Sequence, residues 1–422
     1  MGNPRIDASG PSDDRTSPDS DAGHGSKDDA GPLRIVLIAP PYFDVPPPAY
    51  GGVEAVVADL ADALVARGHD VTLIGAGKPG TAATFVPTWE QTIPERLGEP
   101  FPEVVHAAVT RRAVEQIAGA GGVDVIHDHT LAGPLNAPSY AAMGLPTVVT
   151  MHGPVDEDLS RYYGVLGQDI NLVAISERQR QLAPELNWVG MVHNAVRVET
   201  WPFRSEKGGY ALFLGRYHPN KAPHLALDAA HAAGVPLVLA GKCAEPLEKE
   251  YFDREIRPRL LPDDHVFGLA DAQQKRELLA NAQCLLFPVQ WEEPFGMVMI
   301  EAMACGTPVV ALRGGAVPEV VVDGVTGIIC DHPDQLADAM AHARKLNPAD
   351  CRQLVAEHFN SDQLGAGYER AYVESLARFR STPPDDTLAL LRTQYAGLEA
   401  DLDRHYADDL LGGAPGETDP AR

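Results

Sequence analysis

The sequence predicts an α/β fold built from two doubly wound parallel sheets that face each other across a cleft. Short apolar runs alternate with segments of helical periodicity, and this alternation occurs twice along the 422 residues. A polar, irregular segment, ETWPFRSEKGG, separates the two series. We therefore expect an N-terminal domain at 32–199, a linker at 200–209 and a C-terminal domain at 210–380, and each domain is long enough to bury a full core.

The first series opens with a strand. The run RIVLIA (Arg34–Ala39) is short, apolar and followed by two prolines, as expected of a buried parallel strand. Gly51 and Gly52 come after a proline-rich loop, helical periodicity continues to Gly68, and Val71–Ile74 starts the next strand. This order makes one βαβ unit. Further strands are expected at Val123–His127, Pro146–Met151, Leu172–Ile175 and Gly190–Val192.

The second series follows the linker with the same pattern. Its strands are expected at Tyr210–Leu214, Pro236–Ala240, Cys284–Pro288, Pro308–Leu312 and Gly327–Cys330, and its clearest helices at Pro223–Ala233 and Met297–Ala304. We expect the helices after Asp334 to pack back across the first domain. Because open parallel sheets bind ligands beyond the carboxyl ends of their strands, the cleft is where chemistry is expected.

Composition excludes several classes of protein. The net charge is −25, from 34 basic and 59 acidic side chains, so the surface should repel both nucleic-acid phosphates and anionic lipids. We therefore expect no nucleic-acid partner and no strong membrane association. No run approaches the roughly 18 apolar residues of a spanning helix, and the polar N-terminus does not resemble a signal peptide, which predicts a cytoplasmic protein. The five cysteines lack CxxC spacing and are expected to be small buried side chains.

The two tails hold a large share of the acid. Residues 1–31 contain seven acids and three bases among many Ser, Asp and Gly residues, which is typical of a disordered acidic tail. Residues 381–422 contain nine acids and three bases. Helical periodicity predicts a helical extension at 381–411, and a disordered tail is expected at 412–422.

The segment WEEPFGMVMIEAMACGTPVV holds the densest group of candidate site residues. Glu293 and Glu301 lie eight positions apart, with Gly296 between them at what is predicted to be the entry to a helix. If the intervening residues are mainly helical, the two backbone positions are separated by up to about 12 Å. Carboxylates so far apart suit two separate hydrogen-bond acceptors for an elongated, hydroxyl-bearing ligand. The alternative is one surface acid and one half-buried acid without a common ligand.

Two basic residues follow the first strand of the second half. In GRYHPNK, Gly215 opens a loop that carries Arg216 and Lys221 at the strand's carboxyl end. An Arg fork and a Lys point charge can neutralise a diphosphate without a metal ion. The alternative is a solvated loop pair. In the first half, Gly51 and Gly52 open a helix whose N-terminus could approach an anion.

Other candidates are weaker. His152 ends an apolar strand and is expected to point into the cleft, whereas His127 and His129 are interpreted as structural. Asp156 and Asp158 could hold a divalent metal, but the two cations already supply positive charge, so no metal site is expected. The glycine pair at 314–315 could add backbone N–H groups. The sequence contains neither GxSxG nor GxxxxGK[ST].

These motifs stand in an order that resembles the retaining family 4 glycosyltransferases of the GT-B fold, which consists of two Rossmann-like domains. GGVE, the strand-end histidine, GRYHPNK, EPFGMVMIEAMACGTPVVA and GGAVPEVVVDGVTG carry the resemblance over residues 33–379. One departure is HNAVR at His193–Arg197, where the family usually has a PNG-like turn.

The resemblance implies a role for each matching residue. It implies that Arg216 and Lys221 contact the diphosphate of a nucleotide sugar, that Glu293 holds hydroxyls of the donor sugar, and that Glu301 binds the ribose. The remaining residues that it places at the donor are Gly51, Gly52, His152, Gly215, Phe295, Gly296 and Met297. The catalytic set expected from it is Glu293, His152, Arg216 and Lys221.

The implied reaction moves a hexose, with retention and without a metal or other cofactor, from a nucleoside-diphosphate sugar to a hydroxyl. UDP-glucose is favoured as donor and GDP-mannose is the second choice. We expect a soluble small-molecule or glycan acceptor, because the first helix offers Glu54, Asp59 and Asp62 rather than bases. Its specificity loops are expected at 42–50, 89–104 and 156–167. The alternatives are a nucleotide-sugar epimerase, a phosphorylase, or a non-catalytic nucleotide-sugar-binding protein on the same fold.

Overall fold

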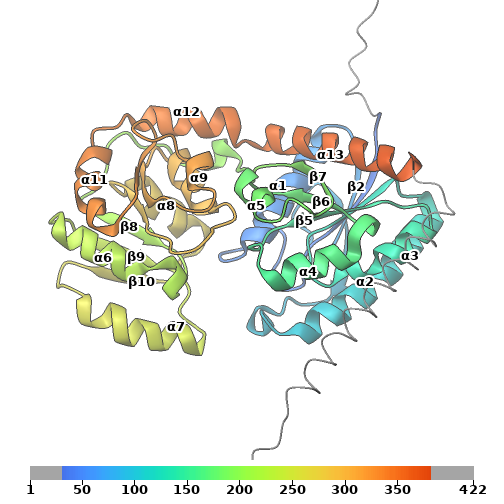
Figure 1. The fold of residues 1–422 in the computed structure, drawn as a ribbon, viewed down its shortest axis with the longest axis horizontal. Coiled ribbons are helices and arrows are strands. Elements are labelled where there is room, and N and C mark those ends of the chain that lie inside the picture. The colour runs from blue at the N-terminus through green and yellow to red at the C-terminus, as the bar shows by residue number, and fades with distance from the viewer. Residues whose placement is uncertain (1–30, 382–422) are drawn as a thin grey trace, which may run out of the picture. The chain divides into compact units, whose positions relative to one another are not determined.

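The computed structural model of the chain describes residues 31–381 (Figure 1). The predictions for the tails at 1–31, 381–411 and 412–422 therefore fall almost wholly outside the described residues. Within the described range, no helix has both the length and the apolar composition needed to cross a bilayer.

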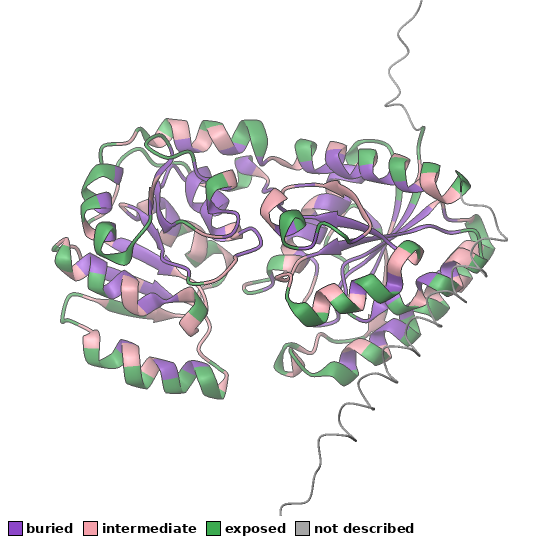
Figure 2. Ribbon diagram, viewed as in Figure 1, coloured by how far each residue is buried: buried purple, intermediate pink, exposed green. Residues whose placement is uncertain are grey.

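The first sheet has seven parallel strands in the order β3-β2-β1-β4-β5-β6-β7. Its strands are β1 Arg34–Ile38, β2 Asp70–Ala76, β3 Thr84–Trp89, β4 Val125–Asp128, β5 Thr147–Met151, β6 Asn171–Ala174 and β7 Trp188–Met191. The helices that connect them are α1 Gly52–Ala66, α2 Pro100–Gly121, α3 Ala137–Ala142, α4 Glu157–Leu166 and α5 Glu177–Leu182. The central strands are buried on both faces, which explains their continuous apolar runs (Figure 2).

The second sheet has six parallel strands in the order β10-β9-β8-β11-β12-β13. Its strands are β8 Ala211–Leu214, β9 Leu237–Ala240, β10 His265–Gly268, β11 Leu285–Phe287, β12 Val309–Leu312 and β13 Gly327–Cys330. Its helices are α6 Pro223–Ala232, α7 Pro246–Tyr251, α8 Ala272–Asn281, α9 Met297–Ala304, α10 Val317–Val320, α11 Leu336–Ala343 and α12 Pro348–His358. Two doubly wound parallel sheets confirm the predicted fold class.

The last described helix, α13 Ser361–Ser381, packs against the first sheet rather than the second. Its Leu364, Tyr368 and Tyr372 belong to the same apolar core as Leu60 of α1. The chain therefore returns to the first domain. Among the described helices after Asp334, α13 follows the prediction, whereas α11 packs against the second sheet and α12 against α9, so for them the prediction was wrong. Residues 361–380 also fall within the segment 210–380 that we expected to form the second domain. Where the chain passes back, Val196 forms an isolated parallel bridge with Asn360, and its N–H donates to the carbonyl oxygen of Phe359 at 2.9 Å.

Two expected loops and two strands differ from the sequence-based expectation. Segment 156–167 is not a loop: it consists almost entirely of α4, and the carboxylate of Asp156 accepts the Leu159 N–H at the start of this helix. Segment 89–104 contains the end of β3 and the first turn of α2. The strands β3 and β10 lie at sheet edges and expose part of their surface, so they lack the continuous apolar runs that marked the buried strands.

Candidate functional site

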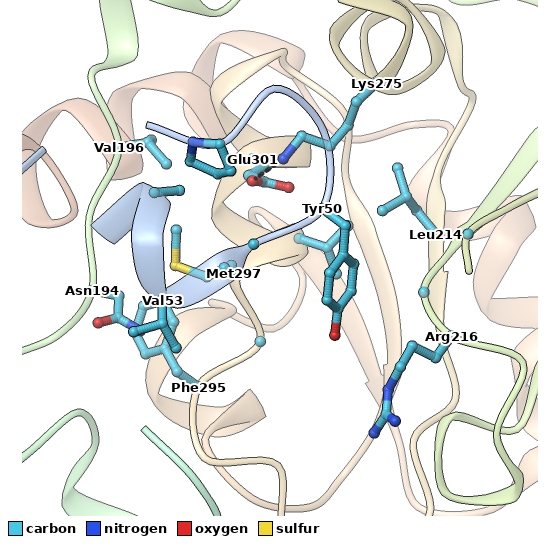
Figure 3. Close-up of a pocket in the computed structure, with 18 of the residues that line it drawn as sticks. Tyr50, Val53, Asn194, Val196, Leu214, Arg216, Lys275, Phe295, Met297 and Glu301 are labelled. Atoms are coloured by element: carbon cyan, nitrogen blue, oxygen red, sulfur yellow. Dashed lines mark hydrogen bonds and ion pairs between the residues drawn. The ribbon is translucent and has the colours of Figure 1, made fainter. Parts of the chain in front are cut away.

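A cavity of about 490 Å³ is lined by residues from both halves of the chain (Figure 3). It collects the carboxyl end of β5, the turn before α1, the loops after β8 and β9, and the N-terminal end of α9. The residues that sequence analysis placed at the site all line it: Gly51, Gly52, His152, Gly215, Arg216, Lys221, Glu293, Phe295, Gly296, Met297 and Glu301. The structure thus brings the predicted residues together, while their individual roles stay predictions.

The two carboxylates are both buried, so the interpretation of one as a surface acid was wrong. Glu293 is 8% exposed and Glu301 is 6% exposed. Glu293 precedes α9 in a loop, and Glu301 lies within that helix, which is buried along most of its length. A buried carboxylate needs a compensating charge or hydrogen bond, because leaving water is costly for an ion.

Each carboxylate has its own lysine. Lys221 forms an ion pair with Oε2 of Glu293, and the indole Nε1 of Trp291 donates to the same oxygen at 2.6 Å. Lys275 Nζ lies 2.6 Å from Oε1 of Glu301, and Figure 3 shows it reaching toward that carboxylate. The pocket therefore presents two acceptors held in place by cations, as two separate hydroxyl-binding sites require.

The loops after β8 and β9 approach each other closely. Gly241 has a φ of 152°, and a Cβ at this position would overlap the carbonyl of Gly215. Only glycine allows this approach without strain. The next residues, Arg216 and Lys242, both line the cavity, so neighbouring strands each deliver a cation to it.

Two acids of one short segment, Glu245 and Glu248, lie next to these two cations. Lys242 Nζ lies 2.9 Å from Oε1 of Glu245, and Arg216 Nη1 lies 3.8 Å from Oε1 of Glu248. Glu248 is fully buried, and its other oxygen accepts the backbone N–H groups of Ala244 and Glu245 at the start of α7. Arg216 thus lies next to a buried carboxylate, whose Oε1 has no hydrogen-bond partner among the described residues.

The glycine turn before α1 is equally constrained. Gly51 has a φ of 141°, and a Cβ there would press against Pro47. Tyr50, just before it, lies with its ring 5.9 Å from Lys242 Nζ, and Figure 3 shows its hydroxyl on the side of the pocket where Arg216 lies. The turn therefore places the N-terminus of α1 and an aromatic side chain next to the strand-end cations.

His152 is held at the carboxyl end of β5. The side-chain amide of Gln179 donates to the carbonyl oxygens of Met151 and Gly153, at 2.9 and 2.8 Å, on either side of it. Its Nε2 lies 2.9 Å from Nδ1 of His129. Burial lowers the pKa of His152 to about 4, so the ring is neutral near pH 7.

Residues 200–356 match the family model described as Glycosyl transferases group 1, and residues 50–210 match Glycosyltransferase Family 4. The chain is 31% identical to a phosphatidyl-myo-inositol mannosyltransferase of Mycobacterium leprae (strain TN), over 73% of this chain and 86% of that protein. The chain belongs to the family 4 glycosyltransferases with the GT-B fold.

Other relatives of this glycosyltransferase agree. It is 30% identical to an alpha-maltose-1-phosphate synthase of Mycobacterium tuberculosis (strain ATCC 25618 / H37Rv), over 81% of this chain and 95% of that protein. Among solved structures, it is similar to AviGT4, a glycosyltransferase involved in avilamycin A biosynthesis. The TM-score is 0.62 at 26% identity, and the match covers 82% of this chain and 98% of that one. The predicted family and enzyme class are thereby confirmed.

Several pocket residues of this glycosyltransferase escaped sequence analysis. Lys242 follows a predicted strand just as Arg216 does, so the same strand-end rule could have found it. Lys275 left no local signal, because it meets Glu301 from a different helix. Asn194 is 3% exposed and lines the cavity, and its Oδ1 has no hydrogen-bond partner within residues 31–381, yet its segment was noted only for lacking a PNG-like turn.

The acids of α1 in this glycosyltransferase do not form the exposed negative face that we expected. Glu54 is 4% exposed, and burial raises the pKa of its carboxyl to about 7. Asp59 and Asp62 both pair with Arg197, at 2.9 and 3.2 Å. Three acids seen as a surface feature are thus buried or paired, and they give no support to the expectation of a soluble acceptor.

Four other residues that the sequence analysis considered, Asp156, Asp158, Gly315 and His127, do not line the cavity of the glycosyltransferase. Asp156 caps α4 and Asp158 is exposed, and no group of three or more His, Cys, Asp or Glu side chains within residues 31–381 is arranged to hold a metal ion. The backbone N–H of Gly315 donates to Glu292 at 3.2 Å. His127 is fully buried, with both ring nitrogens hydrogen-bonded to Tyr372 and Thr150, which fits a structural role.

The cysteines were expected to be small buried side chains. Cys284, Cys305, Cys330 and Cys351 are buried, and Cys243 is half-buried.

Proposed function

We propose that this chain transfers a hexose from a nucleoside-diphosphate sugar to an acceptor hydroxyl and retains the anomeric configuration. One observation supports this most: a single cavity holds two buried carboxylates, each paired with its own lysine, beside the strand-end cations Arg216 and Lys242. Carboxylates suit sugar and ribose hydroxyls, and the cations suit a diphosphate. UDP-glucose is our favoured donor and GDP-mannose the second.

In this proposal the leaving diphosphate is stabilised by fixed positive charge. As the bond to the anomeric carbon breaks, negative charge grows on the diphosphate and positive charge on the sugar ring. Arg216, Lys221 and Lys242 would face the first of these charges, and pre-placed charge lowers a barrier because it needs no reorganisation during the reaction. The acceptor attacks from the face that the diphosphate leaves, and a phosphate oxygen accepts its proton, so neither a metal ion nor a protein nucleophile is required.

Donor binding would open the ion pair between Lys221 and Glu293. In the free site Lys221 neutralises the buried carboxylate. A bound donor offers a phosphate for the lysine and hydroxyls for the glutamate, so both groups exchange one charged partner for a ligand. Trp291 keeps Oε2 of Glu293 in position during this exchange. The pair thus keeps the site from holding an unpaired charge when it is empty.

The acceptor is a hydroxyl compound whose identity the first domain would determine. The two relatives named above differ in the reaction that their names describe: one is a phosphatidyl-myo-inositol mannosyltransferase and the other is an alpha-maltose-1-phosphate synthase. We keep a soluble acceptor and a cytoplasmic location as proposals. The proposal of a soluble acceptor now rests on the net charge of −25 alone.

A thermal-shift screen of nucleotide sugars, followed by a transfer assay with Glu293→Gln, tests the proposal. A donor that binds only the folded protein raises the melting temperature, so UDP-glucose or GDP-mannose should do so while free glucose should not. Glu293→Gln should keep the fold and lose at least about 100-fold in transfer. Glu250→Gln, on a side chain that is 69% exposed, is the control. Equal turnover in both variants would refute the role of Glu293.

A further inference from the structure

Three histidines, His127, His129 and His152, form a row of neighbouring rings, and His152 is the one that lines the cavity. His127 lies in β4 and His129 directly follows that strand, whereas His152 directly follows the neighbouring strand β5. The rings of His127 and His129 lie 4.0 Å apart between centroids, and those of His129 and His152 lie 5.2 Å apart and are stacked. His152 lines the cavity, whereas His129 is 5% exposed.

The pair His129 and His152 shares one proton along a hydrogen bond. Nδ1 of His129 lies 2.9 Å from Nε2 of His152, so one nitrogen donates and the other accepts. Burial lowers the pKa of both rings, which keeps them neutral, and a neutral ring carries a single N–H. The direction of this hydrogen bond therefore decides which nitrogen of His152 carries the proton.

The opposite side of His129 fixes that direction. Its Nε2 is buried without a hydrogen-bond partner among the residues that the structure describes. A buried N–H without an acceptor is rarer and costlier than an unused lone pair. The proton of His129 therefore belongs on Nδ1, from which it donates to Nε2 of His152. Since Nε2 of His152 accepts, the proton of His152 itself must be on Nδ1.

We propose that His129 is a positioning residue, which holds His152 in the Nδ1–H tautomer so that His152 offers the bound sugar a hydrogen-bond donor. Nδ1 of His152 makes no hydrogen bond within residues 31–381 and is not among the polar atoms buried without a partner, so it is accessible, and His152 lines the cavity. The inference rests on the proposed function. It assigns His152 a donating role toward a sugar oxygen and excludes it as the base that accepts the acceptor's proton.

Side chains of α13 hold the first histidine of the row, His127, in place. Nδ1 of His127 lies 2.8 Å from the hydroxyl of Tyr372, and its Nε2 lies 2.7 Å from Oγ1 of Thr150. Tyr368 is 2.9 Å from the same Thr150 oxygen. Both tyrosines belong to α13, so the last described helix fixes His127, and the ring of His129 packs at a tilt against that of His127.

Two variants of equal shape separate positioning from packing. In His129→Asn the amide N–H₂ can replace the Nδ1–H donor, whereas in His129→Asp the ionised carboxylate can only accept. Ring ¹⁵N chemical shifts in the full-length, histidine-labelled protein report the tautomer of His152, and the signal is assigned by its loss in His152→Gln. We expect the Nδ1–H tautomer in the wild type and in His129→Asn, and an Nε2–H or doubly protonated ring in His129→Asp.

The transfer rate adds a second readout. His129→Asp should lose about 10- to 100-fold in kcat, and His129→Asn should recover most of that loss. An Nε2–H tautomer in the wild type, or equal kcat values for the two variants, would overturn the inference. The tautomer is measured without any sugar, so a wild-type protein with the expected tautomer but no transfer would count against the proposed function alone.

Discussion

Replacing Glu54 by Gln should make the stability of the first domain less dependent on pH. Glu54 lies in the first turn of α1, and burial raises the pKa of its carboxyl from the ordinary value of 4.5 to about 7. A carboxyl with a higher pKa in the folded state contributes stability below pH 4.5, and this contribution is lost as the pH rises through 7. The two pKa values differ by the equivalent of about 3 kcal/mol.

Urea unfolding at pH 5 and pH 8, followed by fluorescence and circular dichroism, measures this effect. The stability of Glu54→Gln relative to the wild type should rise between these pH values by up to about 3 kcal/mol, because the neutral amide is never ionised. If the two domains unfold separately, the first-domain transition should respond. Glu250→Gln makes the same chemical change at an exposed site and is the matched control. A relative stability of Glu54→Gln that does not change between pH 5 and pH 8 would refute the reasoning.

Three binding and stability measurements and one membrane measurement test other parts of the structure. Lys221→Ala should weaken UDP binding by about tenfold or more in calorimetry, and an unchanged affinity would place the diphosphate elsewhere. Glu248→Gln keeps an acceptor for the start of α7 but loses the charge behind Arg216, so UDP affinity should fall by about twofold to fivefold; tighter binding would contradict this. Gly241→Ala should cost at least about 2 kcal/mol in unfolding, because its φ of 152° and the carbonyl of Gly215 leave no room for a Cβ; a wild-type midpoint would show that the loop relaxes. In co-sedimentation at low salt with anionic vesicles, most of the protein should stay in solution, and pelleting would refute a soluble acceptor.

The fold could be predicted where burial alone decides the sequence pattern. Strand Arg34–Ile38 and helix Met297–Ala304 are buried on nearly all sides, so their apolar runs marked them within a residue or two. The edge strands β3 and β10 were missed because they face solvent on one side. Pro87 lies within β3, and proline is rare inside strands except at sheet edges such as this one.

The site could be predicted where a motif lies within one loop or helix. Arg216 was found because ligands bind at the ends of strands, and Glu293 was found because of its spacing to Glu301 around the expected start of a helix. The burial and ion pairs of the α1 acids could not be predicted. Arg197, which pairs with Asp59, is far from α1 in the sequence and comes close to it only in the folded domain. Lys275 was missed for the same reason, since its contact with Glu301 exists only after folding.

The return of α13 to the first sheet means that this domain is not a continuous stretch of chain. A fragment ending near residue 200 would lack Leu364, Tyr368 and Tyr372 and would leave their apolar contacts facing water. Such a fragment should need a separate peptide of 361–381 to fold. The chain also crosses between the domains twice, and the two crossings are tied to each other where Val196 pairs with Asn360. A double crossing restrains twisting between the domains. We therefore expect opening and closing to be a hinge rotation about an axis through the two crossings, rather than free rotation about a single connection.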